Sequence, residues 1–270
     1  MSNMIASLYN IRLLDELAEK RTIIHNIHPL MKVLTTCVYL IVTVSFNKYE
    51  LSGLLPLVFY PIIVITLADI PMIPLLKRML IVSPFIIGIG LFNPLFDHSP
   101  MVVLPWIQIS GGWISFFSIM LKGVLTILAA LVLIATTGMT RIAAALRMLR
   151  IPRVFILQLL LTYRYISVLI EEVGRTVRAY SLRSRGEKGI RFSNWGSLTG
   201  QLLIRTLERA QRVYHSMCCR GFTGEYNAGS EKRIQIGDIL YFTGWGLCFV
   251  VIRYFNIPAA IGSLITGVGR

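Results

Sequence analysis

Charged residues are scarce in this chain. Only 15% of its 270 residues are Asp, Glu, Lys or Arg, whereas 55% are hydrophobic and the mean hydropathy is +0.68. This balance excludes a water-soluble globule of this length and indicates an integral membrane protein. The first thirty residues carry charges and lack an uninterrupted apolar core before a small-residue cleavage site, so we expect no cleaved signal peptide.

The chain also lacks the motifs of nucleotide and metal chemistry. No Gly-x-x-x-x-Gly-Lys-Ser/Thr loop occurs, so the usual backbone cradle for nucleotide phosphates is missing. The four histidines and four cysteines show no ligand spacing and no Cys-x-x-Cys pair. We therefore expect no cofactor and no metal site in this chain. These residues are His25, His28, His98, His215, Cys37, Cys218, Cys219 and Cys248.

What is present is a set of long apolar runs. Five of them approach the ~17 to 25 residues that cross a ~30 Å hydrocarbon layer, and they lie at 33–46, 51–68, 79–96, 113–137 and 236–252. The first reaches spanning length if Lys32 snorkels from its end. The sequence predicts an all-α polytopic membrane protein with about five transmembrane helices, the third bent at Pro84 and Pro94.

A further apolar run at 154–170 is about long enough to cross as well. Arginines crowd both of its ends, and Gln158, Thr162 and Arg164 lie within it. Crossing would place one basic flank outside. We expect this run to lie along the inner interface or under the other spans, with a sixth span as the alternative.

Positive charge is concentrated in residues 138–235. This stretch holds seventeen Lys and Arg against six Glu, which is +11 of the chain's +14. Because Lys and Arg favour cytoplasmic loops, this stretch and loop 69–78 should face inward. Loop 97–112, without Lys or Arg, should face outward. With the amino terminus inside, five spans place the carboxyl terminus outside.

Two amphipathic stretches within the basic region follow one plan. Apolar residues recur at helical spacing in 166–180 and 203–217, with arginines on the other face. Each stretch ends on an arginine-glycine step, Ser184-Arg185-Gly186 and Cys219-Arg220-Gly221. One interpretation is a helix stop, because glycine tolerates the left-handed backbone that follows a helix. The other is docking, because a terminal arginine can insert its planar fork into an acidic groove of a partner.

The basic region could instead contact other anions. Anionic membrane lipid is an expected partner, at roughly 1 kcal/mol per basic residue near the surface. Nucleic acid is not expected, because no recognition module or aromatic stacking platform lies among the arginines. An enzyme is disfavoured because the spans carry almost no acids and no mid-span histidine. A self-sufficient membrane carrier remains an alternative, although intramembrane polar groups are sparse.

Several ordered pieces carry a resemblance to a known family. They are Ile24-His25-Asn26-Ile27-His28-Pro29 with Lys32, Thr136-Thr137, Leu146-Arg147-Met148-Leu149-Arg150-Ile151-Pro152, Tyr163-Arg164-Tyr165-Ile166, Glu171-Glu172 and the two arginine-glycine steps. In their order and spacing the chain resembles the transmembrane T component of energy-coupling-factor (ECF) ABC transporters, most closely the cobalt-transport, CbiQ-like branch. The family pattern usually has alanine before each arginine-glycine step, where this chain has Ser184 and Cys219.

The resemblance implies a non-catalytic coupling subunit in a prokaryotic inner (plasma) membrane. Two ABC-type ATPase subunits, which bind ATP and Mg, would dock on Arg185 and Arg220. The membrane part would hold a substrate-binding (S) subunit, with a small accessory membrane subunit as a further candidate partner. ATP-driven closure would then reorient the S subunit, with cobalt as the expected cargo and nickel or a vitamin as alternatives. The chain would comprise an amino-terminal interfacial segment and four spans (1–137), a cytoplasmic coupling-helix domain (138–235), and the last span and tail (236–270).

Lys122 is a charge inside an apolar run. A lysine at the bilayer centre costs about 2.5 to 3.5 kcal/mol on insertion scales, so its ammonium should reach protein, a polar partner or water. One interpretation is that the span begins later than 113 and Lys122 snorkels to the interface. The other, implied by the arginine that the family often has here, is that Lys122 holds the S subunit or a neighbouring span.

Overall fold

The computed structural model describes residues 17–20, 22–96, 100–103, 108–184, 190–224 and 233–255. These residues belong to two compact units. One contains the stretch from 17 to Gly138 together with the stretch from 233 onward, and the other contains 139–224. We refer to them as the membrane unit and the hairpin unit.

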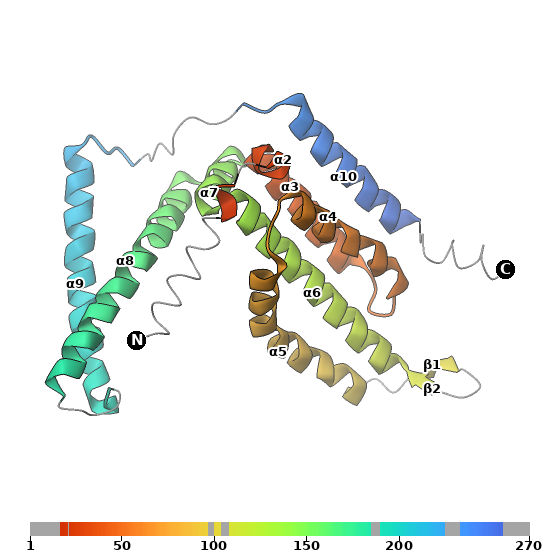
Figure 1. The fold of residues 1–270 in the computed structure, drawn as a ribbon, viewed down its shortest axis with the longest axis horizontal. Coiled ribbons are helices and arrows are strands. Elements are labelled where there is room, and N and C mark those ends of the chain that lie inside the picture. Colours follow the sequence, from red (N-terminus) through yellow and green to blue (C-terminus); the bar gives the residue numbers. More distant parts are fainter. Residues whose placement is uncertain are drawn as a thin grey trace. The chain divides into compact units, whose positions relative to one another are not determined.

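The membrane unit is built from apolar helices (Figure 1). They are α2 (Ile23–Asn26), α3 (Pro29–Ser45), the 3-10 helix η1 (Ser52–Val58) followed by α4 (Phe59–Leu67), α5 (Met72–Phe96), α6 (Gly111–Thr137) and α10 (Ile236–Tyr254). A short antiparallel hairpin, β1 (Pro100–Val103) with β2 (Gln108–Ser110), lies in the predicted loop 97–112. Apart from this hairpin, the regular structure of the described residues is helical, as the sequence predicted.

Three helices of the membrane unit, α5, α6 and α10, are long and apolar enough to cross a membrane. The helix α3 and the segment Ser52–Leu67 are apolar but shorter. The predicted loop 69–78 is too long, because α5 already begins at Met72, and its inward orientation stays a prediction. The predicted run began at position 79 because Lys77 and Arg78 precede it. Pro74 nevertheless fits the first turn of a helix, where its missing N–H costs nothing.

Close packing of α5 on α6 depends on glycine. A Cβ on Gly123 would lie 2.9 Å from the side chain of Ile86, and one on Gly90 would lie 2.9 Å from that of Phe116. Small residues let neighbouring spans approach closely where lipid offers no hydrophobic driving force. The helix α5 is bent (Figure 1), as predicted, and it contains Pro84 and Pro94, which lack backbone donors.

An aromatic cluster joins α3, α4 and α10. The rings of Tyr39 and Tyr60 have centroids 4.8 Å apart, and Phe249 lies 5.4 Å from Tyr39 and 5.2 Å from Tyr60. Trp245 approaches Tyr60 edge-on at 4.8 Å. Such offset and edge-to-face pairs add to the burial of the rings, so this cluster holds the last helix of the chain against the first spans.

The outer face of the membrane unit is apolar. On α5, Leu80, Ile81 and Phe85 are each more than 70% exposed. Lipid tails are as apolar as these side chains, and a spanning helix can therefore leave them uncovered by protein. This exposure agrees with a helix that lies in a bilayer.

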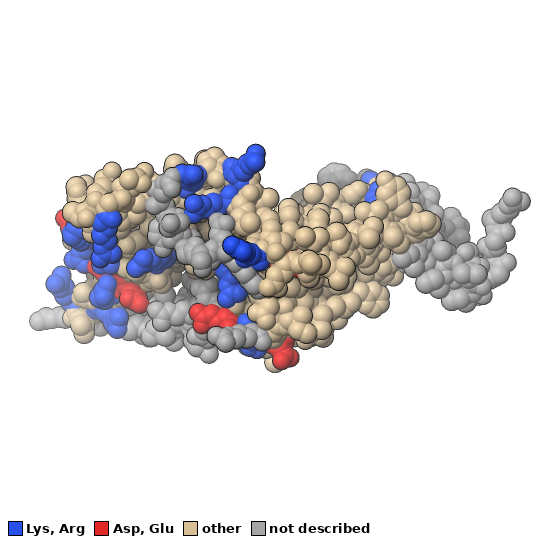
Figure 2. Space-filling view, turned by 90° about the horizontal axis from the view of Figure 1, so that it is seen from above, with Lys and Arg blue, Asp and Glu red and all other residues tan. Residues whose placement is uncertain are grey.

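The hairpin unit contains α7 (Met139–Met148), α8 (Arg153–Arg183) and α9 (Phe192–Cys219). The apolar run 154–170 is the first half of α8, which continues unbroken through the amphipathic stretch that follows. By length and composition α8 also qualifies as a membrane span, in line with the alternative of a sixth crossing. Figure 2 shows Lys and Arg gathered over this unit, whereas the membrane unit is almost uniformly uncharged in that view.

Candidate docking surface

The first arginine-glycine step follows the end of α8. The helix ends at Arg183, and Ser184 is its carboxyl-terminal cap, with its N–H donating to the carbonyl oxygen of Tyr180 at 3.0 Å. The hydroxyl of Ser184 donates to the carbonyl oxygen of Ser181 at 3.3 Å. Arg185 and Gly186 lie outside the described residues.

The second step closes α9 with a Schellman motif. Gly221 has a φ of +79°, its N–H donates to the carbonyl oxygen of Cys218 at 3.0 Å, and the N–H of Phe222 donates to that of Met217 at 3.1 Å. Glycine adopts this left-handed backbone without the steric cost of a Cβ. The helix-stop interpretation thus describes the local structure here.

The stop leaves Arg220 at the tip of the helix. Arg220 is exposed, and its side chain makes no hydrogen bond or ion pair with any other residue that the structure describes, whereas its backbone N–H donates to the carbonyl oxygen of Met217 at 3.0 Å. A guanidinium in this position presents its donor fork to an outside acceptor. The two interpretations are therefore compatible at Arg220, because a helix stop leaves the arginine side chain in a position from which it could dock.

The two side chains directly before Arg220 are exposed. Cys218 and Cys219 are exposed free thiols. A side-chain hydrogen bond with Cys218 raises the pKa of Tyr214 above its usual range. None of the residues of α9 is buried, so the end of this helix is open to solvent.

The two helix ends are far apart within the hairpin unit. The helix α9 has 28 residues, which at ~1.5 Å per residue gives a length of about 40 Å. It starts at Phe192, nine positions after Arg183 ends α8, and finishes at Cys219. The carboxyl end of α8 lies close to the start of α9, where Asn194 contacts Tyr180, and the step at Arg220 lies at the far end of α9.

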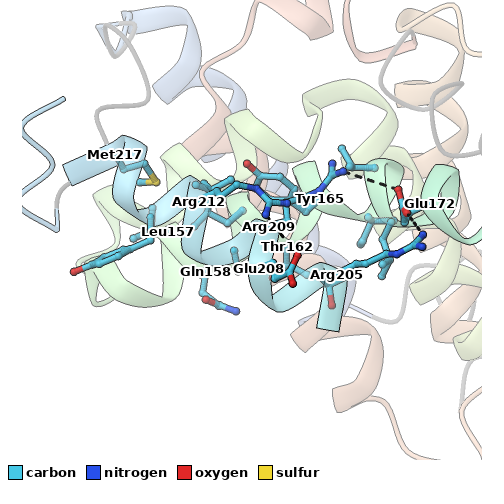
Figure 3. Close-up of a pocket in the computed structure, with 18 of the residues that line it drawn as sticks. Leu157, Gln158, Thr162, Tyr165, Glu172, Arg205, Glu208, Arg209, Arg212 and Met217 are labelled. Atoms are coloured by element: carbon cyan, nitrogen blue, oxygen red, sulfur yellow. Dashed lines mark hydrogen bonds and ion pairs between the residues drawn. The ribbon is translucent and has the colours of Figure 1, made fainter. Parts of the chain in front are cut away.

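Glu172 of α8 links the two long helices. Its carboxylate lies 2.7 Å from Arg175 on the same helix, and 3.1 Å from Arg205 and 3.9 Å from Arg209 of α9. Figure 3 shows the α9 arginines reaching Glu172. Nearer the turn, the amide nitrogen of Asn194 donates to the hydroxyl of Tyr180 at 2.9 Å. Sequence reasoning did not identify this link, because the 33 positions between Glu172 and Arg205 leave no local signal.

Lys122 caps a neighbouring helix of the membrane unit. The helix α6 starts at Gly111, two residues before the predicted span, and Lys122 lies eleven positions after this start. Its ammonium donates to the carbonyl oxygen of Phe46 and, at 3.4 Å, to that of Asn47, directly after α3. The contact with the end of α3 matches the second interpretation as far as a neighbouring span is concerned.

A buried polar cluster that sequence reasoning missed lies at one end of α3. The backbone N–H of His28 donates to Asp238 at 2.8 Å, and Lys32 donates to the carbonyl oxygens of Thr136 at 2.9 Å and His25 at 3.5 Å. All five residues are at most 4% exposed. In the described part of the chain no three His, Cys, Asp or Glu side chains are grouped so that they could hold a metal ion. The cluster therefore ties α2, α3, α6 and α10 together.

These features define a class of protein. Apolar helices long enough to span a bilayer, joined in sequence to a basic helical hairpin, describe a multi-pass membrane protein. The family CbiQ, described as "Cobalt transport protein", matches residues 20–230, and the chain belongs to this family. As a CbiQ member it is a non-catalytic membrane component of a transport system, as the sequence predicted.

Two relatives extend the comparison. The chain is 27% identical over 230 residues to an uncharacterized protein of Methanocaldococcus jannaschii, covering 81% of this chain and 78% of the relative. It is 28% identical over 105 residues to the nickel permease LarQ of Lactiplantibacillus plantarum, covering 39% of this chain and 38% of that protein.

Proposed function

We propose that this chain is the transmembrane coupling (T) subunit of an ECF-type importer. In this role it transmits the ATP-driven motion of two ATPase subunits to a membrane substrate-binding subunit. The observation that supports this most directly is Arg220, exposed at the tip of α9 by a Schellman stop. The first arginine-glycine step follows the end of α8 in the sequence, and Arg220 lies at the far end of α9, a helix about 40 Å long. Two separated cationic tips suit two separate ATPases, one for each tip.

The hairpin between the tips has the properties of a transmission element. Motion of an ATPase moves the other end only if the helices behave as one body, and Glu172 with Arg205 and Arg209 holds α8 to α9. ATP and Mg belong to the ATPases in this proposal, and Ser184 and Cys219 are small enough to let the arginine beside each reach an acidic groove. The S subunit, with an accessory subunit as a further candidate, contacts the membrane unit.

A divalent transition metal is the proposed cargo. The family is described as a cobalt transport protein, and a relative over part of the chain is named a nickel permease. Competition between radiolabelled cobalt and nickel in cells that carry the complete transporter would assign the metal. In this proposal the S subunit holds the ion and this chain moves the S subunit.

Charge reversal at the two tips tests the proposal. Arg185→Glu and Arg220→Glu should each weaken co-purification with the ATPases, and the double variant should abolish ATP-driven uptake while membrane insertion stays intact. A glutamate repels the acidic groove that the arginine would enter. Arg178→Glu, on an exposed position of α8 seven residues before Arg185, is the matched control and should leave uptake near the wild-type level. Normal uptake by the double variant would refute docking.

The orientation of the hairpin unit is tested separately. Ser193 is exposed at the start of α9, so a single cysteine at this position in a cysteine-free background is open to reagents. The positive-inside bias places it in the cytoplasm. A membrane-impermeant maleimide should therefore label Ser193→Cys only after the cells are opened, and labelling of intact cells would reverse the proposed topology.

A further inference from the structure

An apolar groove opens between α8 and α9. The helices are linked near their turn by Glu172 with Arg205 and by Tyr180 with Asn194. Beyond these contacts lies a groove of about 700 Å³. Its apolar lining includes Leu157, Leu161 and Leu169 of α8 and Ala210, Val213 and Met217 of α9. Figure 3 shows Arg205, Arg209 and Arg212 projecting beside it from α9.

One part of the groove is cationic. Arg209 and Arg212, together with the hydroxyl-bearing Tyr165 and Ser216, line an adjoining depression of about 360 Å³ that contains no carboxylate among its lining residues. Glu208 pairs with Arg212 at 3.6 Å, but both side chains are more than half exposed. Exposed pairs of this kind contribute little, so Arg212 can turn toward another anion. Arg209 is only at the 3.9 Å limit of contact with Glu172.

We propose that this groove binds an anionic phospholipid. Its phosphate lies between Arg209 and Arg212, where the two guanidinium groups supply charge-assisted hydrogen bonds, and an acyl chain lies along the apolar lining. The α8 wall of the groove belongs to the run 154–170, which is apolar enough to contact a bilayer. An acyl chain can therefore lie against this wall of the groove.

Charge complementarity favours a lipid over the other occupants. A free phosphate would satisfy Arg209 and Arg212 but leave the apolar lining in contact with water. An apolar partner helix would cover the lining but leave the arginines without an anion. An anionic phospholipid satisfies both at once. This binding does not require ATPase docking at the helix tips, so it stands independently of the proposed coupling role.

Lipid retention by the purified full-length protein tests the site. The delipidated protein in neutral detergent is offered phosphatidylglycerol and phosphatidylcholine with identical acyl chains, and native mass spectrometry measures the bound lipid. Phosphatidylglycerol should be preferred. Arg209→Gln with Arg212→Gln should lower its retention by about 30-fold, which corresponds to roughly fivefold for each basic residue near the headgroup.

A matched control separates this site from the general positive charge of the hairpin unit. Arg178→Gln with Arg183→Gln removes the same charge from α8 outside the groove and should leave retention within about twofold of wild type. Ala210→Phe fills the groove without removing an arginine and should also lower retention. If the Arg209/Arg212 variant fails to fold, Ala210→Phe carries the test.

Several results would overturn the proposal. Equal retention of phosphatidylcholine by the wild-type protein would remove the role of the arginines. An equal loss of phosphatidylglycerol retention in the Arg209/Arg212 and Arg178/Arg183 double variants would mean that the lipid is held by the general positive charge of the hairpin unit. Displacement of phosphatidylglycerol by inorganic phosphate would indicate a simple anion site, and a purified complex with a partner helix in place of lipid would assign the groove to protein.

Discussion

The carboxylate of Asp238 accepts a hydrogen bond of 2.8 Å from the backbone N–H of His28, 210 positions earlier in the chain. The other carboxylate oxygen accepts one of 2.8 Å from the N–H of Gln235, completing a capping box at the start of α10. Asp238 is only 4% exposed. One buried acid thus starts the last helix and ties it to the residue that precedes α3.

Replacing this acid should destabilise the membrane unit. Asp238→Ala leaves two backbone N–H groups without their acceptor, and a lost buried partner costs about 1 to 3 kcal/mol. We expect a lower midpoint of thermal unfolding in detergent, measured by tryptophan fluorescence. Glu208→Ala removes an exposed acid from α9 and is the control. Equal midpoints for Asp238→Ala and wild type would show that other groups satisfy these donors.

Lys122 is expected to matter for stability. Lys122→Met removes the donor to the carbonyl oxygens of Phe46 and Asn47, and hydrogen bonds to a charged group contribute about 1.5 to 3 kcal/mol. The purified chain alone should therefore unfold at a lower temperature. Lys122→Arg, which keeps charge and donors, should recover part of the loss.

The same variants separate this role from contact with the S subunit. If Lys122 binds the S subunit instead, Lys122→Met should leave the unfolding of the isolated chain unchanged and lower co-purification of the S subunit. A fall in thermal stability without the S subunit present would assign Lys122 to the end of α3.

Composition and periodicity were enough to locate the helices. Four of the five predicted spans coincide with a single helix each, and the run 51–68 is divided between η1 and α4. The helices could be located because length and low charge, which a span needs, are local properties of the sequence. The start of α5 was missed, since Lys77 and Arg78 interrupt the apolar run without interrupting the helix. The hairpin β1–β2 was missed too, because strands of three and four residues give almost no periodic signal.

The candidate site was only partly readable from sequence. The step at Arg220 was found because a helix stop has a local signature in Gly221. The contacts of Glu172 and Asp238 join residues 33 and 210 positions apart, and such pairings depend on how the helices pack. The sequence shows which residues are charged, but it does not show which of them form pairs in the folded chain.

Gly221 should be required for the position of Arg220. At a φ of +79°, an ordinary L-residue costs about 1 to 2 kcal/mol and a β-branched one more. We expect Gly221→Val to redirect the end of α9 and weaken ATPase co-purification, although Arg220 itself is retained. Asn tolerates the left-handed region, so Gly221→Asn should bind close to the wild-type level. Equal binding by both variants would show that docking does not depend on the Schellman stop.

Glu172 should control how firmly α9 is held to α8. Exposed ion pairs each contribute about 0.2 to 1 kcal/mol to stability. Glu172 forms ion pairs with Arg205 at 3.1 Å and with Arg209 at 3.9 Å. Glu172→Gln should therefore raise amide hydrogen exchange in the middle of α9 by about two- to fivefold. Raising the salt to 1 M should do the same to the wild-type protein, because the Debye length falls to about 3 Å.

A double-mutant cycle tests whether the Glu172–Arg205 ion pair holds α9 to α8. If the Glu172–Arg205 pair holds the helices, adding Arg205→Gln to Glu172→Gln should change exchange less than the sum of the single effects. Glu208→Gln is the control, because Glu208 pairs with Arg212 within α9 and makes no link to α8. Additive single effects, or an equal response to Glu208→Gln, would mean that apolar contacts hold the hairpin. In that case ATPase motion would pass through the side chains that line the groove, and Glu172→Gln would leave uptake unchanged.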